Sequence, residues 1–207
     1  ISLQGSSFGG NAAKDTAHKL WLMEKAKELG CSRVKFTGAK RGEQGGLGTV
    51  IEVLKELAPA AEDLDVLVTV ENHANNNIEN IEDYEKIFAA VDSSHVGMCL
   101  DMGTSHVGMC LDMGHFDGAG VSNFDIIEQF HSKINHIDLK DVVAFGTYKS
   151  VPYGEGVTKG EEIIQALIDK GYSGYVVIEQ APPKEGLELV QEMTRIYNQF
   201  AKFEKKA

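Results

Sequence analysis

The sequence predicts an α/β fold with a parallel sheet, and three observations lead to this class. Apolar runs of strand length alternate with segments of helical period along the chain, which is typical of βα units. The linkers are short, and no Pro/Gly/Ser-rich boundary divides the 207 residues. The chain is 43% hydrophobic and 25% charged, like an ordinary globular protein of a size that one core can serve. We therefore expect a single domain over residues 1–207.

Six strands are expected, because six short apolar runs each stop at a polar or charged residue or a glycine. They cover residues 1–4, 33–37, 66–71, 107–112, 134–139 and 175–179. A helix is expected after each strand, because each intervening segment carries an apolar stripe of helical period and begins near Gly, Ser, Asn or Asp. These helices cover residues 13–29, 49–61, 81–91, 123–132, 160–170 and 185–203. Two stretches, 37–48 and 141–156, are expected to be irregular loops at the ends of strands.

An 11-residue tandem repeat interrupts this pattern. Residues 94–103 (SHVGMCLDMG) recur unchanged as residues 105–114, with Thr104 between the copies. One βα unit cannot use both copies as the same strand, so one copy must be looped out, form an added strand or be disordered. Asp101 and Asp112 are therefore equivalent candidates for one position. The spacing of the upstream helix fits the first copy, and that of the downstream helix fits the second.

Charged residues stand at the carboxyl ends of four expected strands. They lie within the segments VENH (70–73), LDMGH (111–115), NHIDLKD (135–141) and IEQ (178–180). Burial of such charges is costly unless a cation or a partner compensates them. A shared divalent metal would do so, and a set dominated by carboxylates suits Mg²⁺, Mn²⁺ or Co²⁺ at least as well as Zn²⁺.

These strand ends resemble those of the xylose-isomerase-like superfamily of TIM-barrel sugar isomerases and epimerases, which also includes inosose dehydratases. The resemblance covers nearly the whole chain and is carried by the order VENH, CLDMGH, HIDLKD, VPYGEG and GYSGYVVIEQ. It implies an eight-stranded (β/α) barrel, of which six βα units are present here. Because the chain opens on Ile1 rather than Met, we expect the first two units to be missing.

The resemblance also implies metal ligands on four successive strands. Glu71, Asp112 and Glu179 match three of these positions. The superfamily usually has His-x-Lys-Asp on the third strand, yet here Asp138 holds the position of the His, and His136 stands two residues earlier. Both side chains face the same side of the strand, so either could be the third ligand, and the register favours Asp138. His115, three residues after Asp112, matches a histidine that contacts substrate, which favours the second copy of the repeat.

The function implied is a divalent-metal-dependent isomerase or epimerase of a small sugar or polyol. In that reaction Glu71 and Glu179 would move a proton through an enediolate, and His115 would orient a hydroxyl or polarise the carbonyl. His73, Lys140 and Glu155 are the expected substrate contacts. The closest alternative is an inosose-dehydratase-type lyase using the same groups. Another is a catalytically inactive or fragmentary barrel that binds only metal or a partner.

Composition limits the partners. A formal charge of −11, from 20 basic and 31 acidic residues, disfavours nucleic acid and anionic membranes. No segment has the length of a membrane span, and no secretory signal is recognised. The three cysteines lack metal-type spacing and indicate reduced thiols, so a cytoplasmic protein is expected. The edges of an incomplete barrel could make the chain a homo-oligomer.

Overall fold

The computed structural model describes residues 2–42, 45–91, 107–179, 182 and 184–204. The chain forms two compact units, Ile1–Cys110 and Leu111–Ala207. The expectation of one domain over residues 1–207 stays a prediction. The first copy of the repeat, with Asp101, lies outside the described residues.

The first unit is built on parallel strands that are hydrogen-bonded in chain order. In the part of the chain that the structure describes, these strands are β1 (Ser2–Gln4), β2 (Arg33–Thr37), β3 (Leu67–Glu71) and β4 (Val107–Asp112). The last two residues of β4 belong to the second unit. In the register, Thr37 is opposite Glu71, and Glu71 is opposite Cys110. Glu71 therefore stands at the carboxyl end of the sheet, where parallel α/β folds place their ligand sites.

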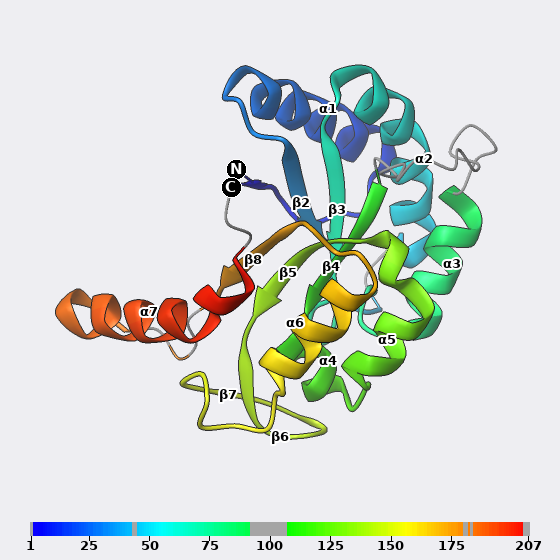
Figure 1. Cartoon of the computed structure of the whole chain (residues 1–207). Coiled ribbons are helices and arrows are strands. Elements are labelled where there is room, and N and C mark those ends of the chain that lie inside the picture. Colours follow the sequence, from blue (N-terminus) through cyan, green and yellow to red (C-terminus); the bar gives the residue numbers. More distant parts are fainter. Residues whose placement is uncertain (1, 43–44, 92–106, 180–181, 183, 205–207) are drawn as a thin grey trace. The chain divides into compact units, whose positions relative to one another are not determined.

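Three helices connect these strands: α1 (Ala12–Glu28), α2 (Gly46–Leu64) and α3 (Ile81–Val91). Helix α1 contacts α2, and α2 contacts α3, as Figure 1 shows. Asn11 caps α1, because its side-chain oxygen accepts a hydrogen bond from the Lys14 N–H at 3.0 Å. Helix α2 buries one apolar stripe, formed by Val50, Val53, Leu54, Leu57 and Ala61. The amphipathic pattern of the sequence thus places the helices against the sheet.

The second unit contains a parallel strand pair, β5 (Ile134–Leu139) and β8 (Tyr175–Ile178). Its helices are α4 (Met113–Ala119), α5 (Asn123–Phe130), α6 (Gly160–Asp169) and α7 (Gly186–Phe200). Short 3-10 turns follow α5 and α7, at His131–Lys133 and Ala201–Phe203. The core of this unit is apolar and is formed by Leu111, Phe116, Ile126, Ile137, Leu139 and Leu167, among others.

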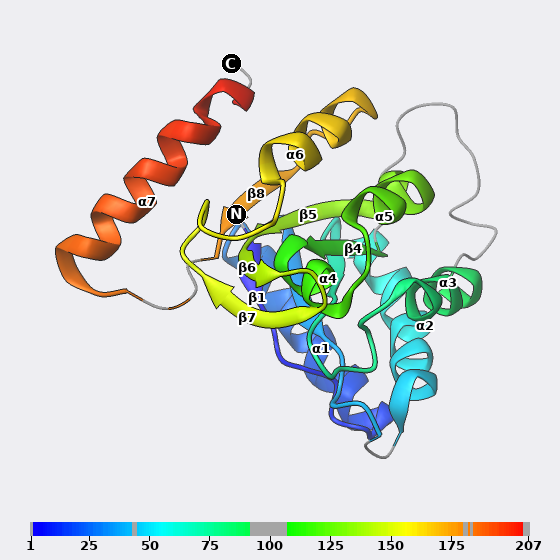
Figure 2. The same cartoon turned by 90° about the horizontal axis from the view of Figure 1, so that it is seen from below.

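An antiparallel hairpin, β6 (Asp141–Ala144) and β7 (Thr147–Val151), follows β5 directly. Both of its strands contact α4, and Figure 2 shows the hairpin beside that helix. The close approach depends on Gly118, because a Cβ there would lie 2.6 Å from the Cδ1 of Tyr148. The hairpin is therefore fixed against the helix that carries His115.

The expected strands and helices match the observed ones to within a few residues at each end. The repeat copy at residues 105–114 supplies β4. Two features differ from the expectation. The stretch 141–156 was expected to be irregular but contains the β6–β7 hairpin, and α4 was not expected. Helix α4 is a short helix that begins because Asp112 caps it and ends at Gly120, whose φ is 74°. So short a helix carries little periodic signal in the sequence.

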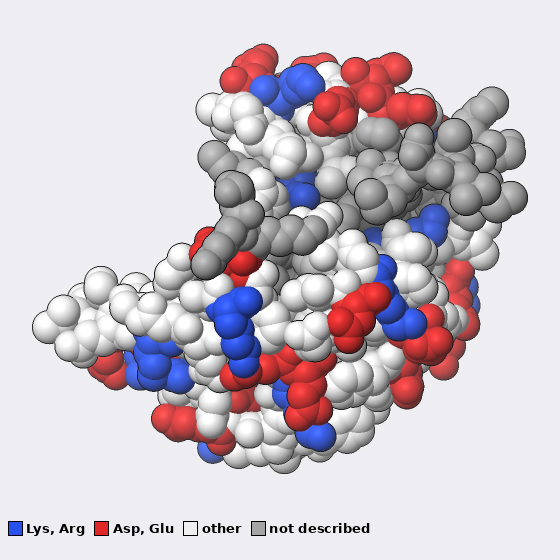
Figure 3. Space-filling model, in the orientation of Figure 1, with Lys and Arg blue, Asp and Glu red and all other residues white. Residues whose placement is uncertain are grey.

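Acidic and basic side chains are mixed on the face drawn in Figure 3. Among the described residues, no helix is both long and apolar enough to cross a membrane.

Candidate metal centre

Three carboxylates of the second unit meet at the carboxyl ends of its strands. Asp112 ends β4, Asp138 lies in β5, and Glu179 follows β8. One oxygen from each lies within 4.8 Å of the others. The β5–β8 pairing brings Glu179 there, and its backbone N–H donates to the Leu139 carbonyl at 3.1 Å. These three strand ends thus lie near one another within this unit, and their assignment as metal ligands stays a prediction.

Lys140 connects two of the carboxylates. Its Nζ lies 3.2 Å from Oδ2 of Asp112 and 2.6 Å from Oε1 of Glu179. It also lies 3.1 Å from Nε2 of His115. The Lys140 stem needs the space beside Gly114, because a Cβ on Gly114 would lie 2.8 Å from Cγ of Lys140. The glycine of the LDMGH segment therefore admits the lysine to the cluster, a role that sequence reasoning missed.

Asp112 is the most deeply buried member, with a side chain that is 0% exposed. Its Oδ1 accepts a hydrogen bond from the His115 N–H at 2.8 Å and so caps α4. Burial raises the pKa of Asp112 to about 8, against the opposing charge of Lys140, and the carboxylates of Glu179 and Asp138 raise it further. A raised pKa means that the neutral form of this buried carboxyl is favoured over its charged form.

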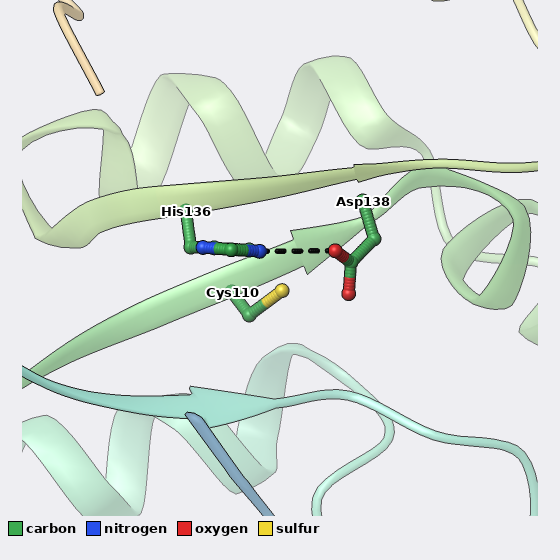
Figure 4. A group of neighbouring side chains, drawn as sticks. All are labelled: Cys110, His136 and Asp138. Atoms are coloured by element: carbon green, nitrogen blue, oxygen red, sulfur yellow. Dashed lines mark hydrogen bonds and ion pairs between the residues drawn. The ribbon is translucent and has the colours of Figure 1, made fainter. Parts of the chain in front are cut away.

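Asp138 is hydrogen-bonded to His136 on the same strand. The His136 Nε2 lies 3.0 Å from Oδ1 of Asp138, as Figure 4 shows. Both side chains are buried, and both face the same side of β5 because they are two residues apart. The sequence predicted this shared side but not that the two residues would bond to each other.

Glu71 belongs to the first unit, where it ends β3 and is buried. Its Oε1 lies 3.4 Å from Nζ of Lys35. Its assignment as a metal ligand and base stays a prediction. His73 lies two residues beyond, exposed, with its N–H donating to the Ile78 carbonyl at 3.0 Å. Its substrate contact also stays a prediction.

Asp141 organises the loop that contains Glu155. Its two carboxylate oxygens accept hydrogen bonds at 2.9 to 3.0 Å from four backbone N–H groups, those of Val142, Gly154, Gly156 and Thr158. Glu155 itself is exposed, and its role as a substrate contact stays a prediction. Sequence reasoning missed this anchoring role of Asp141, because its partners are backbone N–H groups, which carry no side-chain signal.

The donor set of this cluster fits a hard divalent cation. Three carboxylates within 4.8 Å of one another face one ammonium group, that of Lys140. Burial and the two neighbouring carboxylates disfavour the charged form of Asp112, and a divalent cation would offset this cost. Oxygen donors are the ligands that Mg²⁺ and Mn²⁺ prefer.

Comparisons with known proteins identify the family of this chain. A family model described as a xylose isomerase-like TIM barrel matches residues 11–197. The inosose dehydratase of Yersinia enterocolitica is 26% identical over 146 residues, which are 63% of this chain and 46% of that protein. The chain thus spans about half the length of this curated relative.

Two solved structures share the fold. An IOLI protein with a bound zinc atom is 20% identical, with a TM-score of 0.78 over 99% of this chain and 78% of that one. The 3-keto-D-glucoside 4-epimerase YcjR of E. coli is 15% identical, with a TM-score of 0.73 over 96% of this chain and 78% of that one. At these identities the likeness shows the fold alone. It confirms the predicted fold class, and the family model confirms the resemblance to this family.

Proposed function

Because the chain belongs to the xylose isomerase-like TIM barrel family, we propose that it is a divalent-metal-dependent enzyme acting on a small sugar or polyol ketone. The reaction begins with removal of a proton from the carbon beside the carbonyl group. The observation that carries the proposal is the cluster of Asp112, Asp138 and Glu179, whose carboxylate oxygens lie within 4.8 Å of one another. The zinc atom of the IOLI structure supports a metal at such a site.

In this proposal Asp112, Asp138 and Glu179 hold the metal. A divalent ion bound there would polarise the carbonyl oxygen and a neighbouring hydroxyl oxygen of the substrate, which acidifies the intervening C–H group. The sequence-based assignment of Glu71 as a further ligand stays a prediction of this proposal.

Glu179 is the proposed base. Its side chain is 40% exposed, whereas the side chain of Asp112 is 0% exposed. Of these two carboxylates, only Glu179 can therefore reach a substrate while it stays near the other ligands. A base must come within hydrogen-bond reach of the proton that it removes.

Lys140 and His115 are the proposed source of the proton that leaves with the departing hydroxyl group. Their nitrogens lie 3.1 Å apart, so a proton can pass from the ammonium to the imidazole. In the dehydration, Glu179 takes the proton from carbon, the C–O bond of the adjacent carbon breaks, and the hydroxide leaves as water with the proton supplied by this pair. The products are an unsaturated ketone and one water molecule.

The name of the curated relative, an inosose dehydratase, favours this elimination over isomerisation. Epimerisation is the second candidate, and the fold shared with a 3-keto-glucoside epimerase supports it. In an epimerisation the proton would return to the same carbon from the opposite face, and no water would be lost. The two reactions share the first step and differ in the fate of the hydroxyl group.

The test is incubation of the protein with Mn²⁺, Mg²⁺, Co²⁺ or Zn²⁺ and a panel of keto-inositols and keto-sugars in D₂O. Exchange of the carbon-bound proton for deuterium, followed by NMR, reports the first step for both reactions. A conjugated product that absorbs in the ultraviolet reports dehydration, and a stereoisomer reports epimerisation.

We expect Glu179→Gln to reduce the exchange by at least about a hundredfold, a typical loss for a missing general base. The matched control is Glu162→Gln, because Glu162 is exposed on α6. If the parent protein exchanges no proton with any metal and substrate of the panel, the proposal is wrong and the catalytically inactive alternative takes its place.

A further inference from the structure

Asp138 and His136, both on β5, are the two candidates for the third ligand position of the centre. Asp138 contributes an oxygen to the carboxylate cluster, whereas that cluster, as found among the described residues, does not include His136. The Nε2 of His136 points instead to Oδ1 of Asp138 at 3.0 Å. His136 is therefore linked to the carboxylate cluster through Asp138.

The hydrogen bond shows which nitrogen of His136 carries the proton. An ionised carboxylate only accepts hydrogen bonds, so Nε2 must be the donor. The other ring nitrogen, Nδ1, is buried and has no hydrogen-bond partner among the residues that the structure describes. A buried N–H at Nδ1 would leave a donor unsatisfied, which costs more than an unused lone pair. The bond to Asp138 therefore assigns the donor role to Nε2 of His136.

A carboxylate has about four lone-pair sites, so Asp138 can accept the His136 hydrogen bond and bind a metal at the same time. The hydrogen bond fixes the orientation of the carboxylate, since Asp138 and His136 are both buried. Metal ligands are commonly oriented by an outer partner in this way, and the loss of such a partner costs affinity.

We propose that His136 is a positioning residue that holds Asp138 as an oxygen ligand, so that the second unit binds its metal through carboxylates alone and selects Zn²⁺ over Mn²⁺ less strongly than a site with an imidazole ligand would. This inference rests on the metal site of the proposed function. It differs from the sequence-based alternative in which His136 is itself the ligand. An all-oxygen set favours hard cations, whereas an imidazole in the set favours Zn²⁺.

The test is the affinity of the full chain for Mn²⁺ and Zn²⁺, measured by calorimetric titration. His136→Leu removes the donor, and we expect it to weaken Mn²⁺ binding by about 10- to 100-fold. His136→Gln keeps an N–H donor near the place of Nε2 and should restore most of that loss. Asp138→His should shift the ratio of affinities toward Zn²⁺ by at least about tenfold. The control is His18→Gln, because His18 is exposed on α1.

A spectroscopic signature separates a positioning role from direct ligation. In the Mn²⁺-loaded parent, electron spin echo modulation should show no directly bound nitrogen, and Asp138→His should introduce one. A bound nitrogen in the parent that disappears in His136→Leu would overturn the proposal. So would a His136→Leu variant that is folded by circular dichroism and binds Mn²⁺ as the parent does.

These outcomes are distinct from failure of the proposed function. A parent that binds neither ion contradicts the metal site itself and with it the enzyme. A parent that binds Mn²⁺ and exchanges substrate protons, yet is unaffected by substitution at His136, contradicts only the positioning role.

Discussion

At the scale of single residues, Asp112 has two roles that act on each other. It caps α4 through the His115 N–H and it belongs to the carboxylate cluster. Its charge is stabilised by the cap and by Lys140 but opposed by burial and by two neighbouring carboxylates. Without metal, ionisation of this one group therefore works against the folded state.

This gives a pH dependence for the metal-free protein. The folded pKa of Asp112 is about 8, above its ordinary value of 3.8, so its contribution to stability is present below pH ~4 and is lost as the pH rises toward ~8. In EDTA, we expect the Tm of the parent, relative to that of Asp112→Asn, to fall between about pH 5 and about pH 8. Thermal melts by circular dichroism at several pH values check this. A Tm difference that is constant with pH would show that Asp112 does not titrate in this range.

At the scale of elements, β5 ends in two adjacent charged residues that serve different structures. Lys140 contacts the carboxylate cluster, and Asp141 holds the chain that returns from the β6–β7 hairpin. The return is close, because a Cβ on Gly156 would overlap the carbonyl oxygen of Val142. Two adjacent residues thus hold two structures: Lys140 contacts the carboxylate cluster, and Asp141 holds the loop that follows the hairpin.

We expect Asp141→Ala to destabilise the protein by about 3 kcal/mol, because it leaves four backbone N–H groups without their charged acceptor, and bonds to charged groups are the stronger class. Asp141→Asn should cost roughly half as much, since one amide oxygen remains. Urea unfolding measures both. Asp125→Asn, an exposed change on α5, should alter the free energy of unfolding by less than about 0.5 kcal/mol. Equal stability of Asp141→Ala and the parent would refute the anchoring role.

The contrast between β5 and the hairpin shows what the sequence could predict. The carboxyl ends of parallel strands meet at one edge, so the pattern of β4, β5 and β8 was enough to bring Asp112, Asp138 and Glu179 together. The sequence did not predict the hairpin. Its anchor, Asp141, bonds to backbone N–H groups, and such bonds leave no pattern in the side chains. For His136 the sequence predicted the face of the strand, but which atom bonds to Asp138 depends on the packed structure.

At the scale of the whole molecule, the comparisons and the structure agree on the family fold, and the carboxylates found together lie in the unit Leu111–Ala207. A metal that binds only the folded state stabilises the fold by mass action. That unit should therefore respond to metal.

We expect Mn²⁺ at about a hundred times its Kd to stabilise the protein by about 2.7 kcal/mol, which raises the Tm by several degrees for a chain of this size. EDTA should reverse the increase, and Asp112→Asn should remove most of it. Differential scanning calorimetry makes the measurement, with Glu162→Gln as the matched control. An equal increase in Asp112→Asn would show that the ion binds elsewhere. The same calorimetric measurement of the Mn²⁺-dependent rise in Tm, made on Glu71→Gln, tests the prediction that Glu71 is a further ligand.

The four backbone bonds of Asp141 have a consequence for how such a protein can evolve. Main-chain N–H groups are present whatever side chains the loop carries, apart from proline, so the loop keeps its anchor while most of its sequence changes. The hairpin tip exposes Phe145, and Tyr148 lies with its ring centroid 6.2 Å from that of His115. Residues at these two positions can therefore be exchanged while the bonds of Asp141 keep the loop in place.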